Sequence, residues 1–449
     1  MRNNLFVGVA AVALVMPAAA MAQETTSAIR GTVTADGAPV AGASVEILNA
    51  ATGARSTATT DANGVFNSTG LRAGGPYTVS VNAPGYAASQ VTDINTTVAQ
   101  TFDLPINLAA EGAGTADIVV TAASLPSARS LSQGPATVLN AEQIANVATV
   151  NRDIRDLERR DPFARLDDTP TGGRAVSFAG QNARFSRFSV DGVPITDNFG
   201  LNTDGLPSRR SPIPLDAIGQ FQAKIAPYDV REGNFTGGAV NLVLRSGTNK
   251  FQGTGFYAQQ TDGLTGNRTK DLRVTLPKYK QENYGAELSG PIIKDKLFFM
   301  VAGERIRGGF PQQQGPTDAN AGIAIPNLSL AQVNQVIQIA QSNYGYDAGG
   351  VVTDSGDKDD RLVGKLDWNI ADGQRFALTG TYAKDEININ SSNTFTTASP
   401  TTGLSLASNN YISGNRLWTV VGQLNSDWTD EISTEVRGFY KDYERLAQP

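Results

Sequence analysis

Beyond Lys250 the chain alternates between apolar and polar side chains over long stretches. In RLVGKLDWNI, every second residue from Leu362 to Ile370 shares one face, whereas Lys365, Asp367 and Asn369 share the other. The same period of two runs through RFALTGTY, LWTVVGQLNSDW and EISTEVRGFYKDY. Because side chains alternate across a β-strand, this pattern predicts about seven strands. A membrane barrel and a soluble sheet of hairpins both show this period, so it does not choose between them.

The connections between these strands are of two kinds. Tight turns are predicted at 294–296, 371–373 and 429–430, and long polar connections at about 308–358 and 385–415. Short turns that alternate with long loops are typical of outer-membrane barrels. Aromatic residues near the strand ends suit the girdles at the two membrane interfaces; they are Trp368, Tyr382, Trp418 and Trp428. The connections therefore favour an incomplete transmembrane antiparallel β-barrel over residues 247–449.

Residues 27–109 show a shorter strand pattern, with an Asp36-Gly37 turn and a second turn at 62–64. Short strands between turn signals predict a small β-sandwich. Its expected core positions are Val33, Val45, Ile47, Tyr77, Val79 and Val81.

Residues 130–246 mix helical and strand patterns, which predicts a small α+β domain. One helix is expected in NAEQIANVATVNRDIRDLERRDP, capped by Asn140. Its apolar positions at helical spacing are Ile144, Val147, Val150, Ile154 and Leu157. FSRFSVDGVPI, AIGQFQAKIA and GAVNLVLRSG indicate short strands and turns. The chain as a whole is thus expected to be mainly β.

Between these two regions, the linker at 110–129 contains the strand-forming segment 118–122. Its flanks, EGAGTA and ASLPSARS, are small and polar. Two interpretations stay open. The segment is either the last strand of the sandwich or an extended strand that adds to the sheet edge of another protein.

The first 22 residues have the features of a secretory signal peptide. Arg2 precedes an apolar run at 5–15, and Ala20-Met21-Ala22 forms a small-residue cleavage site. Cleavage is expected between Ala22 and Gln23, so the protein is exported from the cytoplasm.

The composition excludes several classes of chemistry. The chain has no cysteine and no histidine, which rules out disulfides, Cys- or His-based zinc sites and Ser-His-Asp centres. Its 37 basic and 43 acidic residues give a net charge of −6, which does not favour a nucleic-acid partner. No P-loop motif is present. The sequence indicates neither enzyme activity nor a cofactor.

Two segments of the long connections are candidate sites. DSGDKDD, at 354–360, offers carboxylates but fits no calcium-loop spacing, so a solvated loop is expected. SLAQVNQVIQIAQSNYGYD, at 329–347, predicts a short helix in the first long loop. Its apolar stripe consists of Leu330, Val333, Val336, Ile337 and Ala340.

Two known families share motifs with this chain. GTV, the turn at 37–39, TDANG, GL and PGY resemble the carboxypeptidase regulatory-like domain, which implies a transthyretin-like sandwich without peptidase activity. DIVVTA resembles the TonB box of TonB-dependent outer-membrane receptors. FSVDGVPITDNFG and the run from IPLDAIGQFQAKIA to SGTNKFQGTGF resemble the plug and the plug–barrel junction of the Oar-like subgroup. The box residues that this resemblance implies are Asp117, Ile118, Val119, Val120, Thr121 and Ala122.

The resemblance implies a transporter of the cell outer membrane with its N-terminal domain in the periplasm. Its partners would be the periplasmic C-terminal domain of TonB, outer-membrane lipid and an unidentified extracellular ligand. Polar plug residues are expected to pair with wall charges such as Glu287, Lys365 and Glu435. The plug residues in question are Arg174, Arg184, Arg187, Arg209, Arg210 and Glu232.

Plugged transporters of this kind have about 22 strands, so about seven suggest that the chain is a fragment truncated within the barrel. The competing interpretation is a cell-surface binding or adhesion protein with a carboxypeptidase regulatory-like module.

Overall fold

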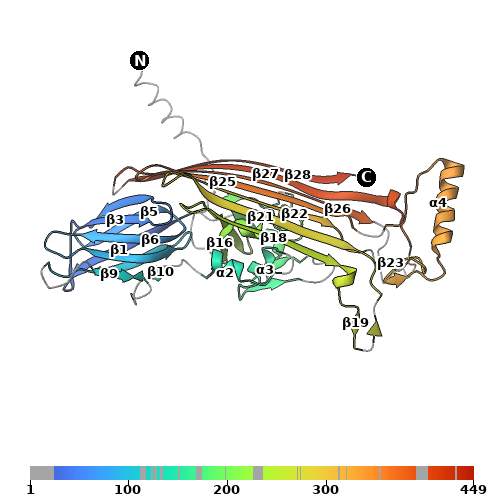
Figure 1. Ribbon diagram of the computed structural model, residues 1–449, viewed down its shortest axis with the longest axis horizontal. Coiled ribbons are helices and arrows are strands. Elements are labelled where there is room, and N and C mark those ends of the chain that lie inside the picture. The colour runs from blue at the N-terminus through green and yellow to red at the C-terminus, as the bar shows by residue number, and fades with distance from the viewer. Residues whose placement is uncertain are drawn as a thin grey trace, which may run out of the picture.

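A computed structural model describes residues 25–111, 118–122, 125, 129–131, 135–149, 152–167, 174–197, 199–225, 236–270, 272–273, 275–311, 314–319, 321–352, 355–390, 403–429 and 432–448. The predicted signal peptide, its cleavage site at Ala22 and Gln23, Asp117, Val150 and Glu232 lie outside these residues. The described chain is mainly β and forms a sandwich, a plug domain and a long curved sheet (Figure 1).

The sandwich consists of two facing sheets. One contains β1 (Thr26–Ala35), β2 (Ala38–Pro39), β5 (Val65–Arg72), β8 (Thr101–Asn107) and β10 (Arg129–Leu131). The other has the order β4 (Arg55–Thr59), β3 (Ser44–Asn49), β6 (Gly74–Asn82), β7 (Ser89–Thr96), β9 (Ile118–Thr121). All six predicted core residues are buried between the sheets: Val33, Val45, Ile47, Tyr77, Val79 and Val81.

Gly31 of β1 marks a point of close approach inside this sandwich. A Cβ atom at this position would overlap the ring of Phe66 and come within 2.9 Å of the Leu104 carbonyl oxygen. Only glycine fits here without displacing its neighbours.

The plug domain is built on a five-stranded sheet. Its order is β11 (Ala136–Asn140), β16 (Ile218–Lys224), β17 (Ala239–Leu244), β14 (Arg187–Val190), β15 (Val193–Pro194). β12 (Ala164–Leu166) and β13 (Val176–Phe178) form a separate hairpin. The Asp191-Gly192 turn between β14 and β15 has positive φ at both residues, +43° and +73°, as an Asp-Gly hairpin turn favours.

The prediction of one long helix in the plug is wrong. The segment forms two short helices instead, α2 (Ala141–Ala145) and α3 (Arg155–Glu158). Asn140 caps α2 as expected, and Ile154 and Leu157 are buried in the plug core. Arg152, between the helices, has a φ of +48°, which a continuous right-handed helix cannot contain.

The long sheet contains seven described strands, each antiparallel to its neighbours in the sheet. In sheet order they are β18 (Gln252–Thr261), β21 (Lys280–Ile293), β22 (Leu297–Gly308), β25 (Asp357–Ala371), β26 (Gln374–Asn390), β27 (Asn410–Asp427) and β28 (Ser433–Gln448). The tight connections at 294–296 and 372–373 and the long one between β22 and β25 lie where the alternation predicts them.

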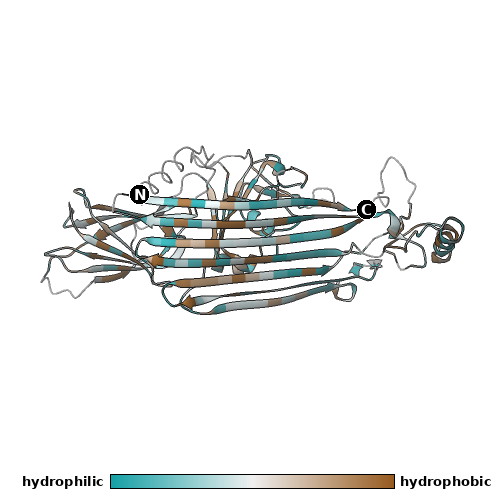
Figure 2. Ribbon diagram, turned by 90° about the horizontal axis from the view of Figure 1, so that it is seen from above, coloured by the Kyte–Doolittle hydropathy of each residue, from teal (hydrophilic) through white to brown (hydrophobic). Residues whose placement is uncertain are grey.

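The two faces of this sheet are the reverse of those in a soluble sandwich. Along β25, Leu362, Leu366, Trp368 and Ile370 are exposed, whereas Val363, Lys365, Asp367 and Asn369 on the inner face are buried. Hydrophobic and hydrophilic residues alternate along the neighbouring strands as well (Figure 2). The apolar segment 362–370 matches the roughly 9–11 residues with which a β-strand crosses a bilayer. This arrangement decides in favour of a membrane-facing wall.

Two of the predicted girdle residues also lie on this outer face. Trp368 and Trp418 are each 47% exposed, and the ring of Trp418 lies 4.6 Å from that of Tyr382 on the neighbouring strand. Trp428, in the turn after β27, is exposed too.

The sandwich and helix α4 (Leu330–Tyr344) lie at opposite ends of the wall (Figure 1). α4 is the helix predicted in the first long loop, and Ser329 and Gln332 form a capping box at its start. Val333 is buried, whereas Val336 is exposed. No helix in the described part of the chain is both long and apolar enough to cross a membrane.

Candidate functional site

Two plug arginines bind the inner face of the wall near its long-loop end. Arg209 and Arg210 both pair with Asp357, the first residue of β25, and the Arg210 Nη2–Asp357 Oδ2 distance is 2.5 Å. The Arg209 Nε atom also donates to Asp385 of β26 at 3.2 Å. Because the Asp357 side chain is only 1% exposed, its charge depends on these two guanidinium groups.

A group of buried charges lies behind this arginine pair, inside the plug. The Arg155 guanidinium binds Asp153 at 2.9 Å and Asp204 at 2.6 Å, and it donates to the Arg209 carbonyl oxygen. Arg155 thereby connects the start of α3 to the segment that carries the arginine pair.

The carboxyl groups around Arg155 titrate differently. Burial, reinforced by the charge of Asp204, raises the pKa of Glu158 well above its usual range. Burial also raises the pKa of Asp204, although Arg155 opposes this shift. Burial favours the neutral form of Asp153 as well, but Arg155 and a backbone N–H outweigh it and lower the Asp153 pKa. Of these three carboxyl groups, Glu158 is the one whose pKa burial moves well above its usual range.

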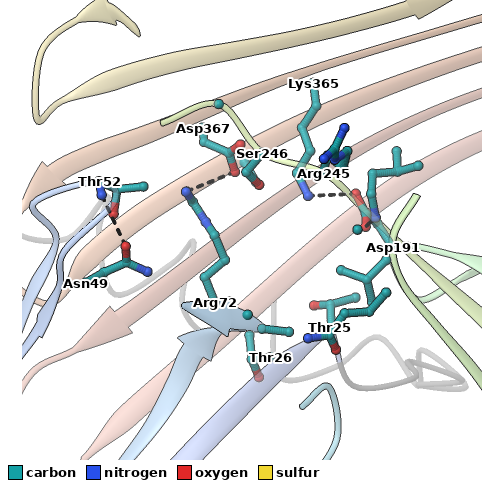
Figure 3. A pocket seen from close by; sticks show the side chains of 18 of the residues that line it. Thr25, Thr26, Asn49, Thr52, Arg72, Asp191, Arg245, Ser246, Lys365 and Asp367 are labelled. Carbon is teal, nitrogen blue, oxygen red and sulfur yellow. Dashed lines mark hydrogen bonds and ion pairs between the residues drawn. The ribbon is translucent and has the colours of Figure 1, made fainter. Parts of the chain in front are cut away.

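A second plug–wall contact lies further along β25, toward the sandwich. The Lys365 Nζ atom lies 3.1 Å from Asp191 Oδ2 (Figure 3). Thr379 of β26 donates to the same oxygen at 3.0 Å. The backbone N–H of Leu244 donates to the other Asp191 oxygen at 2.9 Å. The Asp-Gly turn of the plug is thus attached to two wall strands.

The sandwich contacts the wall at its short-turn end. Arg72 of β5 reaches Asp367 of β25 at 3.1 Å (Figure 3). Arg375 of β26 donates to the Gly70 carbonyl oxygen at 2.5 Å. Ser56 of β4 donates to Asp427 at 3.3 Å. A cavity of about 430 Å³ lies where sandwich, plug and wall meet, and its lining includes Arg72, Asp191, Arg245, Lys365, Asp367 and Arg375.

The sandwich also contacts the plug directly, through Gln220 of β16. The Gln220 Oε1 atom accepts from the Val98 N–H at 2.9 Å, and its Nε2 atom donates to the Thr96 carbonyl oxygen at 2.9 Å. Gln222 adds a longer bond of 3.4 Å to the Val98 carbonyl oxygen. Since Thr96 ends β7, this strand is linked to the plug at its C-terminal end.

The segment expected as a linker contributes strands to the sandwich. β9 lies parallel to β7, with Val119 opposite Gln90 and Val120 opposite Val91. Val120 and Ala122 pack on the sandwich core, whereas Val119 is 60% exposed. Of the two interpretations left open by the sequence, the structure shows the sandwich strand as the position that the segment occupies. A role in binding a partner remains a prediction.

The predicted plug–wall pairs are correct only in part. Arg209 and Arg210 do bind the wall, and Lys365 does bind the plug, but their partners Asp357, Asp385 and Asp191 were not anticipated. Glu287 also faces the plug as expected, because its Oε2 atom lies 3.8 Å from Arg245 Nη1. Two expected residues pair elsewhere: Arg174 binds Asp156 inside the plug, and Glu435 binds Arg437 on its own strand.

The expectation of a solvated loop at DSGDKDD is wrong for its second half. Residues 357–360 belong to β25, and Asp357 and Asp359 on its inner face are buried. The missed signal was the period of two, which continues N-terminal to Leu362. Arg361, Asp359 and Asp357 share the inner face with Lys365. Within the described residues, no group of carboxylates is arranged to hold a metal ion.

An apolar outer face, a polar inner face and a plug held against that inner face define the wall and plug of a plugged outer-membrane β-barrel.

Comparison with known proteins agrees with this class. Residues 28–109 match the family described as carboxypeptidase regulatory-like domain, and residues 243–322 match the family described as outer membrane beta barrel domain. The chain therefore carries both domains and belongs in the outer membrane. Over 134 residues it is 32% identical to the TonB-dependent transporter Oar of Myxococcus xanthus. This segment spans 28% of the chain and 12% of that relative.

Two solved outer-membrane proteins are partly similar to this chain in structure. The outer-membrane transporter YddB of Escherichia coli has a TM-score of 0.48 and 14% identity, with 68% of this chain and 38% of that chain covered. The siderophore receptor PirA of Acinetobacter baumannii has a TM-score of 0.45 and 18% identity, with 69% and 40% covered. The chain thus spans well under half the length of these receptors.

Proposed function

We propose that the protein is a TonB-dependent outer-membrane receptor that passes an unidentified ligand across the membrane, and that it is not an enzyme. The observation that carries this proposal is the plug held by ion pairs against the inner face of a membrane-facing wall. A plug fixed by buried pairs such as Asp357 with Arg210 closes the lumen, so passage requires that these contacts be broken. The sequence relationship to a TonB-dependent transporter supports the proposal.

The energy for this change would come from TonB, which would bind the box at 117–122. An extended segment binds a partner by adding a strand to its sheet, and the strand-forming residues of β9 suit this mode. Since the short turns of such barrels face the periplasm, the sandwich and the box would lie on the side where TonB acts. Outer-membrane lipid would cover the exposed face of β25.

The experiment compares cells that carry the full-length protein, a deletion of 118–122, or no protein. Mass spectrometry of the culture medium follows which solutes are taken up or released, so no ligand need be chosen beforehand. We expect a solute whose movement depends on the protein and is lost in the deletion.

A matched five-residue deletion of 266–270, around β19 (Arg268–Thr269) at the end of the wall away from the sandwich (Figure 1), controls for general damage. If the 118–122 deletion behaves like the intact protein, the box assignment is wrong. A surface-binding protein would show that result together with retained adhesion of the cells.

A further inference from the structure

We propose that the carboxypeptidase regulatory-like domain holds the TonB box as its own edge strand and so keeps it from binding TonB. We call this state the reserve. The inference rests on the proposed function and adds a regulation of the same site. Its starting point is that β9, which contains four of the six box residues, is already paired with β7.

The pairing uses the same features that a partner would use. Four residues of β9 are in register with β7, so one backbone edge of the segment is taken by the sandwich. The apolar side chains of one face are taken as well, because Val120 and Ala122 pack on the sandwich core. A partner that needs this edge and this face must first separate β9 from β7.

The pairing is also weak enough to be reversed. β9 is short, it lies at the edge of its sheet, and Val119 on its other face is exposed. Edge strands with few buried side chains are among the first elements to open locally. Separation of β9 leaves most of the sandwich core in place, since the buried residues of β3 and β6 supply much of that core.

A disulfide between β7 and β9 tests the proposal. Gln90 and Val119 are opposite each other, and neighbouring strands lie about 4.7–4.9 Å apart, within the Cα separations that a disulfide spans. These 449 residues contain no cysteine, so Q90C/V119C introduces the only two thiols among them. The full-length protein with this pair is purified from the outer membrane in detergent, and binding of the purified TonB C-terminal domain is measured before and after reduction.

We expect the oxidised protein to bind the TonB domain at least tenfold more weakly than the same protein after reduction. Comparing two redox states of one variant cancels any effect of the substitutions themselves. R30C/N67C is the matched control, since Arg30 and Asn67 are exposed, face each other on β1 and β5, and do not contact β9. Its oxidised and reduced forms should bind equally.

The outcomes separate the two proposals. A peptide covering residues 115–124 serves as the positive control for the box. If the peptide binds the TonB domain but the oxidised and reduced proteins bind equally well, the reserve is refuted and the box stands. Failure of the disulfide to form under oxidising conditions also refutes the reserve. If neither peptide nor reduced protein binds, the proposed function itself is wrong.

Discussion

Replacing Asp357 with asparagine should loosen the plug strongly, because this carboxylate is buried between two arginines. Removing one partner of a buried ion pair costs about 3–5 kcal/mol. Arg209 keeps Asp385 at 3.2 Å and Arg210 keeps Asp359 at 3.6 Å, so we expect the lower end, about 3 kcal/mol. A loss of this size corresponds to a roughly 100-fold change in an equilibrium constant.

Hydrogen exchange of the protein in detergent measures this change. Amides of the plug strands β16 and β17 should exchange roughly 100-fold faster in D357N, if the plug opens as a unit. Asp360 provides a matched control on the same strand. It also binds two arginines, Arg305 and Arg307, but its side chain is 32% exposed.

Arg305 and Arg307 lie on the wall strand β22, and exposed ion pairs contribute about 0–1 kcal/mol, so D360N should leave the exchange of the plug almost unchanged. Equal effects of D357N and D360N would refute the reasoning, because loss of a carboxylate that does not contact the plug would then loosen it as much. An unchanged plug in D357N would show that the arginine pair does not hold it.

Two further predictions concern the plug and the sandwich. Because the pKa of Glu158 is raised in the folded plug, the unfolded chain loses this proton first as the pH rises above about 4.3, and stability declines from there toward the folded pKa. E158Q should remove this decline and raise the unfolding temperature at neutral pH. Thermal unfolding of both proteins between about pH 4 and pH 8 tests the prediction. A decline in E158Q as steep as in the unchanged protein would contradict it. G31A should destabilise the sandwich by about 1–3 kcal/mol, because the added methyl group overlaps Phe66. An unfolding midpoint equal to that of the unchanged protein would show that the two sheets can separate without cost.

Much of the fold could be predicted from local patterns. The period of two located the wall strands and separated Leu362 and Trp368 from Lys365 and Asp367, because strand geometry fixes the face of each side chain. Core positions of the sandwich such as Val45 and Val79 followed from the same rule.

The partners across the plug–wall boundary could not be predicted in this way. Which acid meets Arg209 depends on how two domains dock, and residues 148 positions apart in the chain carry no local sign of their contact. The prediction of one long plug helix was wrong for a related reason. Apolar spacing continues through Ile154, but the backbone turns at Arg152, whose guanidinium group binds the distant Asp216 at 2.6 Å.

The position of Asp357 has a consequence for how the outside of the protein could reach its centre. This residue is the first of β25, and it follows directly on the connection that carries α4. The carboxylate of Asp357 thus joins the end of that connection to the guanidinium groups of Arg209 and Arg210. A ligand that moved this connection would act on the same residue that anchors the plug.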